Sequence, residues 1–413
     1  MARNNRSATK QKSIMRGGGG FFSTVFAGTD WLTLLICVAA SAYGLLLVHS
    51  ATLREAARQE SAFSRDAVIM AAAVGLGVAL ALIMSFVDYE LVLRFWYVFA
   101  GVCLVLMLLL LVPGIGVSPT GRDDAKSWIK LPITASGIFF QPSELLKIGF
   151  ILSFTWHLHT VREHINKLKT IAMLGVHALI PFGIVVYTGD LGSALVFLSI
   201  TAGMLFLAGL KLRWFAGMLA LLGAAAPVVW IYFINTFQRN RFYAVYAPGM
   251  LTDAEYKKVI YQQQQARYAM GSGRITGKGL FKGSYIQTGS VPESQNDMIF
   301  AVAGEELGFL GALGVMLVLA LLVIRLARVA NRTRNVKARL LCGGVSLMIG
   351  AQAIINIGMC IKLLPVIGIT LPFFSAGGSS NLCTYIAIGL AMTVYRHQNE
   401  HEDTRSYFDY LYS

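Results

Sequence analysis

The sequence has few charged residues for its length. Asp, Glu, Lys and Arg make up 14% of the 413 residues and hydrophobic residues make up 56%, whereas soluble proteins carry about 25% charged residues. An ordinary soluble domain is therefore excluded. The 35 basic residues exceed the 21 acidic ones by 14. They lie between apolar runs, where they orient a membrane protein, so the excess does not indicate binding to nucleic acid.

Patterns that bind metals or form disulfides are also missing. The five cysteines contain no Cys-x-x-Cys pair and lie in or beside apolar segments, as small buried side chains do. His157 and His159 are two residues apart, so they point away from each other on a helix. His397 and His401 have the spacing of one helical face, but they fall in a charged tail. They indicate a zinc site only weakly.

Long apolar runs are what the sequence does have. A membrane-spanning helix needs about 20 mainly apolar residues. Ten such runs lie near residues 31–49, 67–87, 91–113, 143–160, 170–188, 191–209, 213–235, 298–324, 340–359 and 376–395. We therefore predict an all-α polytopic membrane protein with about ten transmembrane helices. This membrane domain covers 29–396, between a basic tail at 1–28 and a C-terminal tail at 397–413.

The orientation follows from the basic residues between the runs. The first run is too long for the core of a cleavable signal, so it is expected to be a retained helix with its N-terminus inside. Basic residues then concentrate in the connections after the fourth, sixth and eighth runs, which the positive-inside rule places in the cytoplasm. Arg54, Arg58 and Arg65 run against this rule. Both termini are predicted to be cytoplasmic.

Two polar connections are then expected on the outer face. One covers 114–141, and the other covers about sixty residues at 236–297. Connections of this length are usually functional or disordered, and we predict an ordered, functional one. Arg239, Arg241 and Lys278 bring positive charge to it beside glycines. Such a group can hold a phosphate or diphosphate, and the alternative is a solvated face.

A carboxylate stands where this long connection meets an apolar run. Asp297 lies in the stretch VPESQNDMIFAVAGEE, followed by Glu305 and Glu306. An Asp costs about 2.5–3.5 kcal/mol at the centre of a membrane helix, and such acids are usually functional. The alternative for Asp297 is a helix N-cap, a position that favours Asp.

Three more ionisable residues lie in or beside apolar runs. Glu144 and Lys147 are three residues apart at the start of the fourth run, so they can pair on one helical face. One interpretation is a structural ion pair. The other is that Lys147 faces a cavity and binds an anionic ligand. Asp190 begins the sixth run, as an N-cap or as a group facing a cavity.

A Gly- and Pro-broken apolar segment covers 356–382. Irregular backbone at membrane depth is tolerated only where it is buried in protein or lines a cavity. We predict a structured plug against the outer cavity, with Ser379 among its hydrogen-bonding groups.

Together these stretches resemble the SEDS family, the RodA/FtsW/SpoVE-type proteins of bacterial cell-wall synthesis. The resemblance rests on QPSELLK, DLGSALV, QRNR, PES…DMIFAV..EELG and LPVIGITLPFFSAGGSS, in this order. It implies a ten-helix peptidoglycan glycosyltransferase that polymerises lipid II at the outer face of the cytoplasmic membrane. It also implies a class B penicillin-binding protein as partner, within an elongation or division complex. The family's essential aspartate falls on Asp297, and its Glu and Lys fall on Glu144 and Lys147.

The chain departs from the family pattern in places. Thr188-Gly189-Asp190 stands where the family commonly has Gln-Pro-Asp, which puts fine specificity in doubt. The opening YGLLLVHSAT favours RodA slightly over FtsW.

The resulting hypothesis makes Asp297 the general base for attack by a sugar hydroxyl. Arg239, Arg241, Lys278 and Lys147, or a divalent cation such as Mg or Mn, would stabilise the departing diphosphate. Two alternatives remain. One is a lipid II flippase, and the other is a non-catalytic scaffold that activates a class B penicillin-binding protein.

Overall fold

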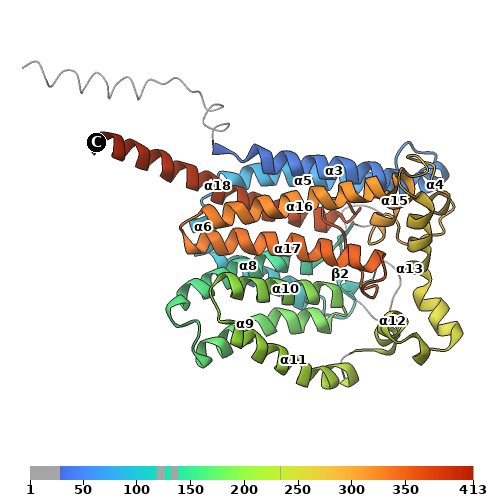
Figure 1. The fold of residues 1–413 in the computed structure, drawn as a ribbon, viewed down its shortest axis with the longest axis horizontal. Helices are drawn as coiled ribbons and strands as arrows, with labels where there is room; N and C mark the ends of the chain where they lie inside the picture. The colour runs from blue at the N-terminus through green and yellow to red at the C-terminus, as the bar shows by residue number, and fades with distance from the viewer. Residues whose placement is uncertain (1–27, 119–125, 132–137, 233, 413) are drawn as a thin grey trace, which may run out of the picture.

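In this computed structural model the described residues are 28–118, 126–131, 138–232 and 234–412. The predicted tail at 1–28 lies outside them, apart from Gly28. In the described part of the chain, each of the ten predicted runs overlaps one main helix, and these helices form one elongated bundle (Figure 1). They are α3 (Trp31–Ala51), α5 (Arg65–Ser85), α7 (Trp96–Leu109), α8 (Pro142–Thr160), α9 (Leu168–Tyr187), α10 (Leu191–Leu207), α11 (Leu212–Tyr232), α16 (Gly308–Arg332), α17 (Val336–Cys360) and α18 (Gly378–Tyr412).

The prediction of an all-helical polytopic membrane protein is confirmed. Among the described residues, six helices are long and apolar enough to cross a membrane, and α7 and α10 are shorter apolar helices. Most of α17 is buried, whereas every residue of α11 keeps some exposure. Figure 1 accordingly shows α17 inside the bundle and α11 along one edge. The predicted tail at 397–413 continues α18 as helix to Tyr412.

Two predicted runs are broken into two helices each. The run predicted at 91–113 overlaps α6 (Tyr89–Arg94) and contains α7, with Phe95 between them. Residues 298–324 contain α15 (Ile299–Glu306) and then α16. Gly308 adopts a φ of +68° at the second break, a conformation that glycine accepts without strain. Backbone groups freed by this break bond to the preceding loop, since Phe309 N donates to Arg274 O and Lys278 N donates to Glu305 O.

The connection at 114–141 forms a small sheet that the sequence did not predict. Strands β1 (Gly116–Val117), β2 (Trp128–Leu131) and β3 (Ile138–Phe140) are antiparallel in the order β1-β2-β3. Ile129 pairs with Phe140 across β2 and β3. Since β3 leads directly into α8, the sheet fixes the entry to that helix.

The long connection at 236–297 is folded. It contains α12 (Thr236–Tyr246), η2 (Pro248–Met250), α13 (Asp253–Gly273) and α14 (Ser284–Gln287). Capping boxes start α12 at Asn235 and α13 at Thr252, which satisfies the first amide groups of both helices. These elements lie at the same end of the bundle as β2 (Figure 1). Two further short elements, α4 (Leu53–Arg58) and η1 (Arg162–His164), follow α3 and α8.

Candidate functional site

Asp297 lies on the segment between α14 and α15, and three parts of the chain hold it. Its side chain is nearly buried, with 8% of the residue exposed. The Gln262 amide of α13 donates to its Oδ1 at 3.2 Å. Asn356 of α17 donates to its backbone carbonyl at 2.8 Å. The N-cap of α15 is Met298, so the N-cap interpretation of Asp297 is wrong.

The irregular segment after α17, residues 361–377, closes around the same loop. Asn356 also donates to Ile369 O of this segment at 2.7 Å. Ser375 Oγ donates to Asn296 O at 2.6 Å, and Ala376 N donates to Gln295 O at 2.9 Å. The backbone around Asp297 is therefore fixed from both sides, as a positioned catalytic group requires.

Glu305 and Glu306 have a structural role that the sequence did not reveal. Both are fully buried. Glu305 accepts hydrogen bonds from Tyr285 N at 2.9 Å and from Lys278 Nζ at 2.7 Å. Glu306 accepts from Ser50 Oγ at 2.6 Å and from Phe281 N at 3.1 Å. These carboxylates fasten the loop before α14 to the break between α15 and α16, and their partners offset the cost of burying their charge.

Glu144 and Lys147 form the predicted ion pair. Lys147 Nζ lies 2.7 Å from Glu144 Oε1, and Lys147 exposes none of its side chain. Gln352 Nε2 of α17 lies 3.5 Å from Glu144 Oε2. The pair therefore lies inside the bundle between α8 and α17.

Asp190 and Ser379 both bond to Gln141, the residue before α8, which the sequence analysis did not single out. Asp190 is the N-cap of α10 and accepts from Ser193 N at 2.9 Å. It also accepts from Gln141 Nε2 at 2.8 Å and Ser143 Oγ at 2.9 Å. Ser379 Oγ accepts from Gln141 N at 3.2 Å. Gln141 opens the QPSELLK stretch, but its partners come from distant elements.

The three predicted cations of the long connection bond to different parts of the structure. Arg239 donates to Ile231 O and Ile234 O, the last carbonyls around the end of α11. Lys278 pairs with Glu305, as described above. Arg241 donates to Val366 O at 2.8 Å, in the segment that also bonds to the Asp297 loop. Of the three, Arg241 is thus the one tied to the surroundings of Asp297.

A protein-built metal site is not formed by the described residues. Within them no group of three or more His, Cys, Asp or Glu side chains could hold a metal ion. A Mg or Mn ion bound mainly through substrate phosphates would not need such a group, so the divalent cation considered from the sequence stays a prediction, and we derive no step through it.

This fold and site define a class: polytopic membrane proteins with a carboxylate held at one end of the helix bundle. The family model described as cell cycle protein, which covers FtsW, RodA and SpoVE, matches residues 30–400. The chain belongs to this family.

Relatives and solved structures agree with this assignment. The chain is 31% identical to a probable peptidoglycan glycosyltransferase FtsW of Trichlorobacter lovleyi, over 88% of this chain and 92% of the relative. It is 29% identical to the peptidoglycan glycosyltransferase MrdB of Escherichia coli K12, over 89% and 94%. A solved chain of a peptidoglycan synthase complex has a TM-score of 0.72 at 27% identity, over 90% of this chain and 99% of that one. The rod shape determining protein RodA of Thermus thermophilus has a TM-score of 0.62 at 26% identity, over 90% and 98%. Because relatives carry both FtsW and MrdB names, the slight preference for RodA stays a prediction.

Proposed function

We propose that this peptidoglycan glycosyltransferase polymerises lipid II and that Asp297 is its general base. The observation that carries the assignment is a nearly buried carboxylate whose backbone is held by α17 and whose Oδ1 is held by Gln262. It caps no helix. A nearly buried carboxylate held in a fixed position is suited to proton transfer.

The reaction joins two sugars with one inversion. The 4-hydroxyl oxygen of one lipid II molecule forms a bond to the anomeric carbon of the other glycan chain. The bond from that carbon to the lipid diphosphate breaks, and the electron pair leaves with the diphosphate. Asp297 accepts the hydroxyl proton, which makes the oxygen a better nucleophile. One carboxylate is sufficient, since no covalent sugar–enzyme intermediate is required.

The site would face the outer side of the cytoplasmic membrane, with both termini in the cytoplasm. The sheet and the helices of the long connection lie at one end of the bundle (Figure 1), as two outer connections would. Arg54, which runs against the positive-inside pattern, donates to Thr288 O in the long connection at 2.7 Å. Its guanidinium therefore contacts the loop that we place outside, while Arg54, Arg58 and Arg65 still run against the positive-inside rule.

Polymer formation by the purified chain is the experiment that separates this function from its alternatives. We expect glycan strands from fluorescent lipid II in detergent, and more of them when a class B penicillin-binding protein is present. The partner is proposed from the likeness to a chain of a peptidoglycan synthase complex. Transport of lipid II across vesicles without polymer would support a flippase instead. Polymer made by the isolated chain would exclude a non-catalytic scaffold that only activates a class B penicillin-binding protein.

Arg241 is proposed to stabilise the departing diphosphate. Loss of one preorganised charge at a transition state usually costs about 10²–10³ in kcat, so we expect Arg241→Gln to lower the polymerisation rate by at least about tenfold. Arg239→Gln is the matched control, since Arg239 bonds to carbonyls at the end of α11. It is expected to retain most activity. Steady-state rates at saturating lipid II compare the two, and equal losses in both variants would contradict the role of Arg241.

A further inference from the structure

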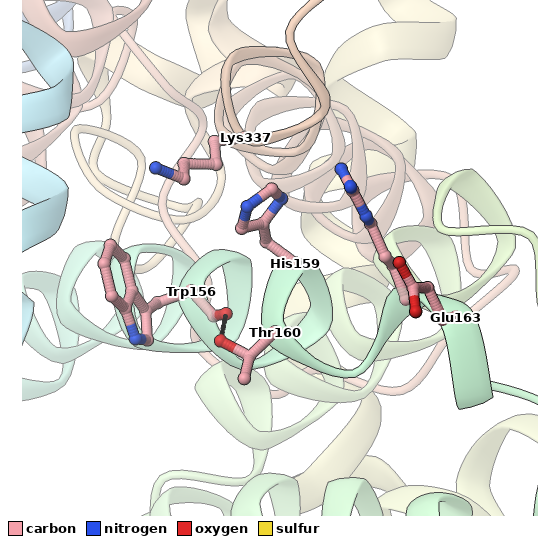
Figure 2. Close-up of a pocket in the computed structure, with 6 residues that line it drawn as sticks. Trp156, His159, Thr160, Glu163 and Lys337 are labelled. Atoms are coloured by element: carbon pink, nitrogen blue, oxygen red, sulfur yellow. Dashed lines mark hydrogen bonds between the residues drawn. The ribbon is translucent and has the colours of Figure 1, made fainter.

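The cleft between the end of α8 and the start of α17 does not favour a charged ligand (Figure 2). Arg162 and Lys337 line it together with Glu163, and Glu90 Oε2 lies 4.0 Å from Lys337 Nζ. Two carboxylates therefore stand against two cations. Helix α13, which contacts the other end of α17, presents a more specific surface.

Helix α13 runs across the end of the bundle (Figure 1). One of its faces packs on α15, since a Cβ added to Gly273 would meet Gly304 O. Ala266 and Ala269 are buried on the same face, because residues three and four apart are neighbours on a helix. The opposite face of α13 is therefore directed away from the bundle.

Two tyrosines occupy this outward face. Tyr261 and Tyr268 are 48% and 50% exposed. They are seven positions apart in the sequence, so they lie in line, separated by about 10.5 Å along the helix axis at 1.5 Å per residue. Gln264 Nε2 donates to Tyr268 Oη at 2.7 Å, which holds that side chain in place. Tyrosines in such positions offer a large, rigid contact surface at a low cost in conformational entropy.

An amide lies between the two rings. Gln265 follows Tyr261 by four positions and precedes Tyr268 by three, so it neighbours both on the helix surface. Its side chain is partly buried, and within the described residues its amide makes no hydrogen bond. An amide can donate and accept hydrogen bonds at once. We call Tyr261, Gln265 and Tyr268 the α13 strip.

The α13 strip adjoins the site around Asp297. Gln262, which follows Tyr261 in the chain, donates to Asp297 Oδ1 at 3.2 Å. Gln265 lies one turn further along α13 and neighbours Gln262 on the helix surface. The strip is therefore continuous with the place where the product would form.

We propose that the α13 strip binds the growing glycan strand. The apolar C–H faces of its pyranose rings pack on Tyr261 and Tyr268, whose rings are large apolar surfaces with a polar tip, and Gln265 bonds to a sugar hydroxyl or acetamido group. The spacing of the two tyrosines, about 10.5 Å, is close to the length of two linked pyranoses, which is the repeat of the strand. The inference rests on the proposed polymerisation, because that reaction makes the strand.

Exposed tyrosines also anchor membrane proteins at the lipid–water interface, and the chain supplies a matched control for that role. Tyr187 and Tyr232 are each 77% exposed and are the last residues of α9 and α11. They lie outside the α13 strip. If the tyrosines of the strip were only interfacial anchors, removing either pair would have the same effect.

Binding of a soluble glycan to the full-length protein in detergent tests the strip without lipid II. The probe is the β-1,4-linked hexamer of N-acetylglucosamine, compared with an α-1,4-linked hexamer of glucose, and ligand-observed NMR gives the dissociation constants. We expect the first hexamer to bind more tightly. Tyr261→Ala with Tyr268→Ala should weaken its binding at least about fivefold, since two aromatic contacts are lost. Tyr187→Ala with Tyr232→Ala should bind as the unaltered protein does.

The length of the strands made from lipid II supplies a second readout. Tyr261→Ala with Tyr268→Ala should shorten the strands several-fold, because each strand is released earlier. The rate of the first coupling between two lipid II molecules should stay nearly unchanged, since the lost contacts do not touch the reacting atoms. Tyr261→Phe with Tyr268→Phe keeps both rings and should restore the length.

Three results would overturn the proposal. The first is equal weakening of hexamer binding in the Tyr187 and Tyr232 pair, which would indicate interfacial anchors. The second is unchanged hexamer binding in Tyr261→Ala with Tyr268→Ala. The third is loss, in that pair, of stimulation by a class B penicillin-binding protein alone, which would assign this face to the partner. Failure of the proposed function is recognised separately, because hexamer binding requires neither lipid II nor turnover.

Discussion

Asp297→Asn is expected to lower the rate of lipid II polymerisation by about 10²–10⁴-fold, the usual contribution of a positioned general base. The substitution keeps the shape and the Oδ1 that accepts from Gln262. The bond from Asn356 goes to the backbone carbonyl and is not affected. The loss of activity should therefore come without loss of folding, and the melting temperature of the variant should stay close to that of the unaltered protein.

The measurement is the single-turnover rate of polymer formation with fluorescent lipid II, with Asp253→Asn as the control. Asp253 is an exposed acid in the first turn of α13, so this variant makes the same chemical change outside the site and should keep full activity. A second readout is lipid II binding, which Asp297→Asn should leave largely intact because the lost interaction develops in the transition state. If Asp297→Asn polymerised at a rate within about threefold of the control, a general base at this position would be ruled out.

The parts of the fold that the sequence predicted are those set by local spacing. Apolar runs of sufficient length become helices because lipid leaves no other partner for their backbone groups. The Glu144–Lys147 pair was predictable because residues three apart share a helical face. The N-cap role of Asp190 was predictable because a helix starts there and Asp suits that position.

What could not be predicted depends on segments that meet only in the folded chain. Glu305 lies 2.7 Å from Lys278, and nothing in the sequence marks this pairing; the expected role of Lys278 as a substrate cation stays a prediction. The break at Gly308 was missed because a single glycine in an apolar run does not reveal its φ. The hydrogen bond from Gln262 to Asp297 could not be predicted either, because the two residues are 35 positions apart in the sequence. The type of a residue indicates which chemistry its side chain can perform. Which residue it pairs with is decided by the packing of segments that are distant in the sequence.

Removing one charge of the Glu144–Lys147 pair is expected to destabilise the fold more than removing both charges. Lys147→Met leaves a carboxylate inside the bundle with only the long contact from Gln352, and breaking a buried pair in this way typically costs about 3–5 kcal/mol. The double variant Glu144→Gln with Lys147→Met leaves no buried charge at this place, so most of the stability should return. Melting temperatures in detergent measure both.

The double variant also separates the two interpretations of this pair. If the pair is purely structural, we expect the double variant to polymerise lipid II at nearly the normal rate. If Lys147 instead meets an anionic ligand, the double variant will be stable but will show a raised KM, because a favourable charge has been lost without a folding defect. Equal stability of Lys147→Met and the double variant would contradict the desolvation argument itself, since it would mean that the Glu144 carboxylate carries no penalty when it is left alone.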